Sequence, residues 1–148
     1  MDERLKYWEL APEGIAKMRA MEHYVNAETG LEPVLLELVR LRASLLNGCE
    51  YCIGLHTAEL KKHNETAERI AAVAEWRGSD AYTHRERAAL GWAEALTDVQ
   101  DGHAPDAVYD EVRKHFSEVE TVNLTLAITT INAWNRIAIG LGKHPGRG

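Results

Sequence analysis

The sequence predicts an all-α protein, a single-domain bundle of about six to seven helices. Two segments carry capping boxes, in which a Ser or Thr starts a helix and a Glu follows three residues later: Thr83 with Glu86, and Ser117 with Glu120. Apolar residues recur at helical spacing through most of the chain. The β-branched residues do not fall in alternating runs bounded by turn signals, so no segment predicts a strand.

Helix starts and stops divide the chain into seven expected helices. Pro12 and Pro33 suit the first position of a helix, where no backbone N–H is needed. Asn64 is expected to cap a short helix that Gly78 ends. No linker is long enough to divide these helices, so we expect one domain over residues 1–148. The expected helices cover roughly residues 12–29, 33–47, 49–63, 64–78, 83–96, 105–116 and 117–142.

The composition argues against a nucleic-acid or membrane function. With 17 Lys and Arg against 23 Asp and Glu, the net charge is −6, and an acidic protein gains nothing from neutralising phosphates. The first residues lack the apolar segment of a signal peptide. The apolar stretch 122–141 is interrupted by three Asn and one Arg, a pattern typical of a buried helix and not of a membrane span. We therefore expect a cytoplasmic protein.

Both cysteines of the chain lie in one short motif with a histidine. If a helix begins near Cys49, the side chains of Cys49, Cys52 and His56 share one face of it. A helix N-terminus favours thiolate over thiol, and a histidine at i+4 can exchange the proton of Cys52. Residues three apart on a helix have Cα atoms roughly 5 Å apart, which is inside the range for a disulfide. The motif therefore predicts a redox-active pair.

Three other interpretations of the pair stay open at this point. A zinc site would need two more ligands, and no second Cys-x-x-Cys or His-x-x-x-His is present. A thioredoxin-type motif would need a strand before Cys49, and none is predicted. Both cysteines could also be small buried hydrophobic residues. Glu37 lies at the margin of an apolar stripe and is as consistent with a solvated face as with a function.

Four residues carry a resemblance to a known family: Glu37, Cys49, Cys52 and His56. Their spacing resembles that of the alkylhydroperoxidase D (AhpD)-like branch of the carboxymuconolactone decarboxylase family. Segments 41–44 (Leu-Arg-Ala-Ser), 47–49 (Asn-Gly-Cys) and 131–136 (Ile-Asn-Ala-Trp-Asn-Arg) are also similar to that family. The resemblance covers roughly residues 32–142 as one helical domain.

The resemblance implies a thiol-dependent peroxidase. It implies that Cys52 attacks the peroxide, that Cys49 resolves the product into a disulfide, and that Glu37 and His56 form a proton relay. An external dithiol, a thioredoxin-like protein or a lipoyl group would act as the reductant, and no haem, flavin or metal would be required. One position departs from the family pattern: Tyr51 stands where some members carry a histidine, which implies a shorter or water-bridged relay.

Two other functions fit the same motif. Glu37 and His56 could act without thiols, as in a carboxymuconolactone decarboxylase-like acid–base enzyme. The cysteines could instead form a redox sensor or hold a metal on the same scaffold.

The long apolar segment 122–141 also predicts self-association. A helix that is apolar around much of its circumference must be covered on most sides, and six shorter helices are a small number for that task. Large amphipathic side chains are enriched at interfaces, and the candidates here are Tyr7, Trp8, Trp76, Trp92 and Trp134. We expect at least a dimer on these grounds, and the family resemblance implies a trimer or a hexamer.

Overall fold

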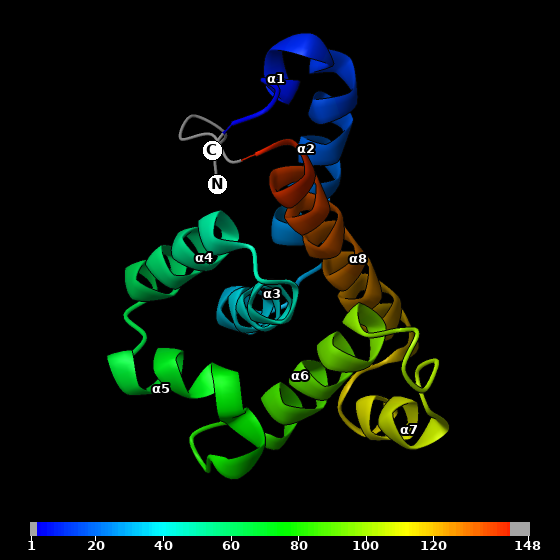
Figure 1. The fold of residues 1–148 in the computed structure, drawn as a ribbon. Helices are drawn as coiled ribbons and strands as arrows, with labels where there is room; N and C mark the ends of the chain where they lie inside the picture. Colours follow the sequence, from blue (N-terminus) through cyan, green and yellow to red (C-terminus); the bar gives the residue numbers. More distant parts are fainter. Residues whose placement is uncertain (1–2, 143–148) are drawn as a thin grey trace.

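The computed structural model describes residues 3–142, and within them every regular element is a helix (Figure 1). The described residues form eight α-helices and one 3₁₀ helix, η1. Their bounds are α1 Tyr7–Leu10, α2 Pro12–Ala27, α3 Pro33–Asn47, α4 Glu50–Lys62, α5 Ala67–Ala72, η1 Val73–Gly78, α6 His84–Thr97, α7 Asp106–His115 and α8 Glu118–Leu141. The all-α class is confirmed.

The predicted count of six to seven helices is too low, because the short helix α1 precedes Pro12. This helix is a single turn of four residues and carries no side-chain cap. One turn is too short to show a helical repeat of apolar residues, so the sequence pattern gives no sign of it.

The expected helix from Asn64 to Gly78 also differs in the structure, both in its cap and in its continuity. The cap is Thr66, whose side chain accepts a hydrogen bond from the Arg69 N–H at 3.2 Å. Asn64 instead has a positive φ of 63°, a conformation that asparagine tolerates better than most residues. The backbone leaves helical geometry at Glu75, so the segment becomes α5 followed by the 3₁₀ helix η1.

The strongest predicted helix boundaries are confirmed. Both capping boxes are fully formed, at Thr83 before α6 and at Ser117 before α8. Gly48 ends α3 with a φ of 67°, in the left-handed region that favours glycine. This residue turns the chain directly from α3 into α4.

Helix α3 is the centre of the molecule. It packs against α4, α6, α8 and η1, and Figure 1 shows it nearly end-on with these helices around it. Nine of its 15 residues are buried, including two charged ones, Glu37 and Arg40. A helix covered on most sides can bring polar side chains into the interior only if each finds a partner there.

Helix α8 is the longest element, with 24 residues. It packs against α2, α3, α4, α6 and α7, and so contacts helices from both halves of the sequence. Its end meets the start of the chain, where the N–H groups of Arg4 and Leu5 donate to the Leu141 carbonyl at 2.8 and 3.1 Å. Among residues 3–142, no helix combines the length and the apolar character that crossing a bilayer requires.

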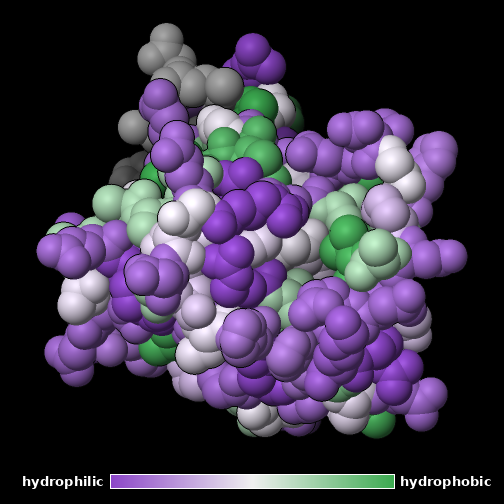
Figure 2. Space-filling model, turned by 90° about the horizontal axis from the view of Figure 1, so that it is seen from below, coloured by the Kyte–Doolittle hydropathy of each residue, from purple (hydrophilic) through white to green (hydrophobic). Residues whose placement is uncertain are grey.

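The exterior is mostly hydrophilic on the face seen in Figure 2, where hydrophobic residues form only small separate groups. Ion pairs join several helices at the surface, such as Arg85 with both Glu32 and Glu120, at 2.8 and 2.9 Å. Such exposed pairs contribute little stability one by one. The core therefore carries most of the stability.

Candidate active site

The two cysteines form a disulfide at the start of α4. Cys49 is the N-cap residue of the helix, and Cys52 lies in its first turn, with a Cα–Cα distance of 5.3 Å between them. The Cys52 N–H donates to Cys49 Sγ at 3.3 Å. Both cysteines are buried. The Cys49 sulfur thus lies at the positive end of the helix dipole, which favours negative charge on it after reduction.

His56 lies one turn after Cys52 on α4 and contacts a carboxylate from α3. Its Nδ1 is 2.7 Å from Glu37 Oε2, and both residues are buried. The four residues predicted to form the site are therefore supplied by two adjacent helices, with Glu37 and His56 in direct contact. Glu37 is only 8% exposed, so it does not lie on a solvated face of α3.

A second partner holds the other oxygen of the same carboxylate. Arg40 donates to Glu37 Oε1 at 2.8 Å through one terminal nitrogen. Through its other terminal nitrogen it donates to Asn26 Oδ1 on α2 at 2.7 Å. The chain of contacts therefore runs from α2 through Arg40 and Glu37 to His56 on α4.

These partners keep Glu37 ionised in the interior. Burial by itself would raise the pKa of the Glu37 carboxyl, but the hydrogen bonds from His56 and Arg40, with the positive charge of Arg40, outweigh it. The pKa of Glu37 therefore lies below its ordinary value of 4.5. An ionised carboxylate can only accept, so Nδ1 of His56 must donate to it. This leaves Nε2 as the ring nitrogen that does not face Glu37.

A cavity of about 240 Å³ opens onto this chain of contacts. It lies between α2, α3 and α4, and neither cysteine lines it. The disulfide packs on another side, against Ala138 and Ile139 of α8, and Tyr51 covers it in part. The cavity is lined by Glu22, Asn26, Glu37, Arg40, Leu55, His56 and Glu59.

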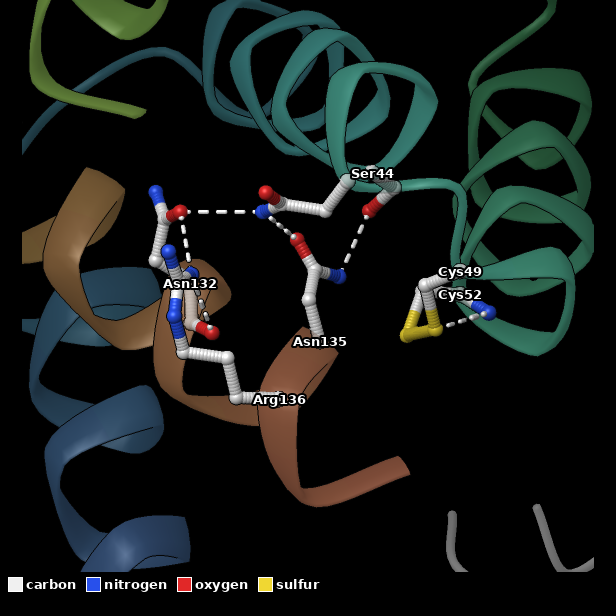
Figure 3. Close-up of a disulfide and its surroundings, with 7 residues drawn as sticks. Ser44, Cys49, Cys52, Asn132, Asn135 and Arg136 are labelled. Atoms are coloured by element: carbon white, nitrogen blue, oxygen red, sulfur yellow. Dashed lines mark hydrogen bonds between the residues drawn. A yellow bond between two sulfur atoms is a disulfide. The ribbon is translucent and has the colours of Figure 1, made fainter. Parts of the chain in front are cut away.

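A network of amide side chains anchors the turn that carries the disulfide (Figure 3). Asn135 on α8 donates to Ser44 Oγ at 3.0 Å and accepts from Asn47 Nδ2 at 2.9 Å. The backbone of the same turn is tied as well, since the Cys49 N–H donates to the Ser44 carbonyl at 3.0 Å. Asn135 thus joins α8 to α3 through side-chain hydrogen bonds next to the turn that carries Cys49.

Sequence reasoning missed Arg40 and Asn26. A usable signal existed for Arg40, because it lies three residues after Glu37 within an otherwise apolar stretch, and a buried cation needs an anion. Nothing in the sequence relates Asn26 to the motif, because it is brought there by the packing of α2. Of the other histidines, those at 23, 63, 84 and 103 are exposed and His115 is half-buried, while His144 lies outside the described residues.

Across residues 3–142, no group of three or more His, Cys, Asp or Glu side chains is arranged to hold a metal ion.

Comparison with known proteins places this site in a family. The sequence profile of the carboxymuconolactone decarboxylase family matches residues 12–95. The uncharacterised protein YdfG of Bacillus subtilis is 39% identical over 144 residues, which are 97% of either chain. The alkyl hydroperoxide reductase AhpD of Hyphomonas neptunium is 49% identical over 48 residues, or 32% of this chain and 27% of that protein.

Comparison of the fold with solved structures supports the same family. A crystal structure from Agrobacterium tumefaciens superimposes with a TM-score of 0.93 at 40% identity, over 97% of this chain and 99% of that one. That protein has no known function and is provisionally assigned to antioxidant defence as an AhpD protein. The profile match and the full-length relative agree with the motif on α3 and α4. The chain therefore belongs to the carboxymuconolactone decarboxylase family, as an AhpD-like member.

Proposed function

We propose that this protein reduces hydroperoxides with the Cys49–Cys52 pair, using Glu37 and His56 as a proton relay and an external dithiol as the reductant. The observation that carries the proposal is the 2.7 Å contact between Glu37 and His56 Nδ1, one helical turn after the disulfide. A disulfide beside a buried carboxylate–imidazole pair is the arrangement that thiolate chemistry needs. The AhpD name of one relative points in the same direction.

The oxidative half of the cycle begins with both cysteines reduced. His56 accepts the Cys52 proton at Nε2, and the thiolate attacks the terminal oxygen of the hydroperoxide. The O–O bond breaks, Cys52 becomes a sulfenic acid, and the alkoxide that leaves takes the proton from His56. Cys49 then attacks the sulfenic sulfur, so that the disulfide forms and water leaves.

The reductive half returns two electrons and two protons to the pair. One thiolate of the external dithiol attacks the disulfide, and its second thiol then closes the reductant's own disulfide. The Cys52 N–H that contacts Cys49 Sγ stabilises negative charge on that sulfur, which favours opening of the bond. Over the whole cycle, one hydroperoxide and one dithiol become one alcohol, one water and one oxidised dithiol.

The test is direct measurement of hydroperoxide loss. The purified protein, supplied with dihydrolipoamide or dithiothreitol, is expected to consume tert-butyl hydroperoxide at a rate proportional to its concentration. One equivalent of hydroperoxide added to the reduced protein should remove both thiols and two hydrogen atoms of mass. No enzyme-dependent loss of hydroperoxide with any of several dithiols would reject the proposal.

A second candidate is an acid–base enzyme that does not use the thiols. The observation that favours it is the cavity, which reaches Glu37 and His56 but is not lined by either cysteine. A Glu–His pair facing a cavity can move protons on a bound substrate, as the name of the family suggests. Replacing both cysteines with serine separates the two candidates, because only an acid–base enzyme would keep its turnover.

We also propose that the protein assembles with copies of itself through α8. Residues 119, 122, 126, 129, 133 and 136 follow the alternating three- and four-residue spacing of a helix–helix seam. Val119 is 70% exposed and Val122 is 59% exposed, which is unusual for valine at such a seam unless something covers it. Four of the five large aromatic residues named above do not serve this purpose, since Tyr7, Trp76, Trp92 and Trp134 are buried within the chain, while Trp8 is half-buried.

The assembly proposal predicts the effect of a charge on this seam. Val122→Glu is expected to lower the mass measured by light scattering toward the 16.6 kDa of one chain, because a carboxylate facing a second α8 must be desolvated. Leu10→Glu, at a residue of α1 that is equally exposed, is the matched control and should leave the mass unchanged. A parent protein whose mass stays at that of one chain at every concentration would contradict the proposal.

A further inference from the structure

Arg40 joins two helices, α3 and α2, through a single planar group. One terminal nitrogen of its guanidinium donates to Glu37 Oε1, and the other donates to Asn26 Oδ1 on α2. The side chain is only 4% exposed, so the loss of either partner would leave part of a buried charge without compensation. Because the guanidinium fork is rigid, fixing one nitrogen on α2 also fixes the direction in which the other nitrogen points.

Arg40 affects His56 through the Glu37 carboxylate, which contacts both residues. Glu37 and Arg40 lie three residues apart on one face of α3, so Arg40 holds Oε1 on the side of its own helix. The carboxylate plane is then set, and Oε2 faces Nδ1 of His56 at 2.7 Å. Without Arg40, Oε1 would face the 240 Å³ cavity, and the carboxylate could rotate or take up a proton there.

We propose that Arg40, held by Asn26, is a positioning residue that orients the Glu37 carboxylate so that His56 keeps its proton on Nδ1 and offers Nε2 to Cys52. The inference rests on the proposed function only for the role given to Cys52. It assigns no contact between Arg40 and a substrate. It gives Arg40 a function that a buried ion pair with a purely structural role would not have.

Other charged groups lie around the Glu37–His56 pair. Glu22 on α2 and Glu59 on α4 line the cavity beside Arg40. Glu59 is paired with Lys62 at 2.9 Å, toward the solvent. Arg40 is thus the cation that offsets several carboxylates around the cavity, and its removal should make protonation of Glu37 easier. A protonated Glu37 can donate to Nδ1, which moves the ring proton to Nε2 and ends the relay.

Two measurements report on this role without using a peroxide. The first is the ¹⁵N NMR spectrum of the His56 ring in the oxidised protein, assigned by its loss in His56→Gln. The second is the pH profile of Cys52 alkylation by iodoacetamide in a reduced Cys49→Ser background. Arg40→Met is expected to give a mixture of ring tautomers and to move the acid limb of the alkylation profile upward by about one pH unit, a tenfold slower reaction at fixed acid pH.

Three further variants separate the possible causes. Arg40→Gln keeps N–H donors without the charge, so it should preserve the Nδ1–H tautomer better than Arg40→Met. Asn26→Ala changes an exposed residue and is expected to fold, and it should shift both readouts in the same direction by a smaller amount. Arg42→Met is the matched control on α3, because the guanidinium of Arg42 contacts Glu94 and the Ala74 carbonyl and not the relay.

The outcomes are distinguishable. Parent-like spectra and pH profiles in folded Arg40→Met, or in Asn26→Ala and Arg40→Gln if Arg40→Met does not fold, would overturn the inference. An equal shift in Arg42→Met would also overturn it, because the effect would then be a general loss of packing. A protein without peroxidase activity whose His56 spectrum still responds to Arg40 would reject the proposed function and leave the positioning role standing.

Discussion

Replacing Cys52 with serine is expected to abolish peroxide reduction, with a loss on the order of 10³-fold or more, as for other covalent nucleophiles. A serine hydroxyl is not ionised near neutral pH, and His56 cannot make it an effective attacking group for the O–O bond. Cys49→Ser is expected to react once and then stop. Mass spectrometry should find one added oxygen on Cys52, or an adduct with a sulfenic-acid reagent.

The opposite result would also have a physical explanation, because Cys49 Sγ has a hydrogen-bond donor of its own. Cys49 Sγ accepts the Cys52 N–H at the helix N-terminus, whereas Cys52 lies one turn before His56. If Cys52→Ser retains the single reaction and Cys49→Ser loses it, the helix N-terminus and not His56 activates the attacking thiolate. The roles of the two cysteines would then be exchanged.

Glu37→Ala is expected to lower the free energy of unfolding by about 3–5 kcal/mol, the usual cost of leaving a buried charge without its partner. The charge left behind is Arg40, which is buried and would keep only Asn26. Chemical denaturation followed by circular dichroism measures the change. Glu59→Ala is the matched control at the rim of the same cavity, and its exposed pair with Lys62 predicts a change of about 0.5 kcal/mol or less. Equal losses in the two variants would contradict this account of the Glu37 site.

The pH dependence of the stability that Glu37 contributes has a definite sign. The pKa of Glu37 is lowered in the folded protein, so its contribution to stability is fully present above its ordinary value of 4.5. That contribution is lost as the pH falls through the folded pKa. The difference in stability between the parent protein and Glu37→Gln should therefore shrink in this acid range. A difference that grows as the solution is acidified would show that the folded pKa of Glu37 is not lowered.

Local signals within one turn predicted most helix starts and ends, the Asn64 cap being an exception. The capping boxes at Thr83 and Ser117, and the glycine at position 48, each act through residues at most four positions apart. The centre of the fold was not predictable in the same way. Segment 122–141 is the longest apolar stretch, yet α3 is the helix around which the others pack. The sequence does not show what share of a helix its neighbours will cover: nine of the 15 residues of α3 are buried, against ten of the 24 of α8.

In the candidate site, too, the relations within one helix were predictable, and the contacts between helices were not. The spacing of Cys49, Cys52 and His56 follows from helix geometry, so their shared face was predictable. The contact of Glu37 with His56 joins two helices, and only the family resemblance related these residues before the structure did. The environment of Glu37 and the contribution of Asn26 depend on how α2 and α4 pack onto α3, which no local pattern encodes.

Because α3 lies at the centre of the fold, the Glu37–His56 contact should be lost only when the whole chain unfolds cooperatively. Amides of a helix covered on most sides should exchange with solvent only when the whole chain opens, whereas those of α7 should exchange through local openings. Glu37, Arg40 and Ser44 all belong to that slowest-exchanging segment. A partly unfolded chain that has lost α3 would retain no relay, so catalytic activity should fall in step with global unfolding and would not report the fraying of α7.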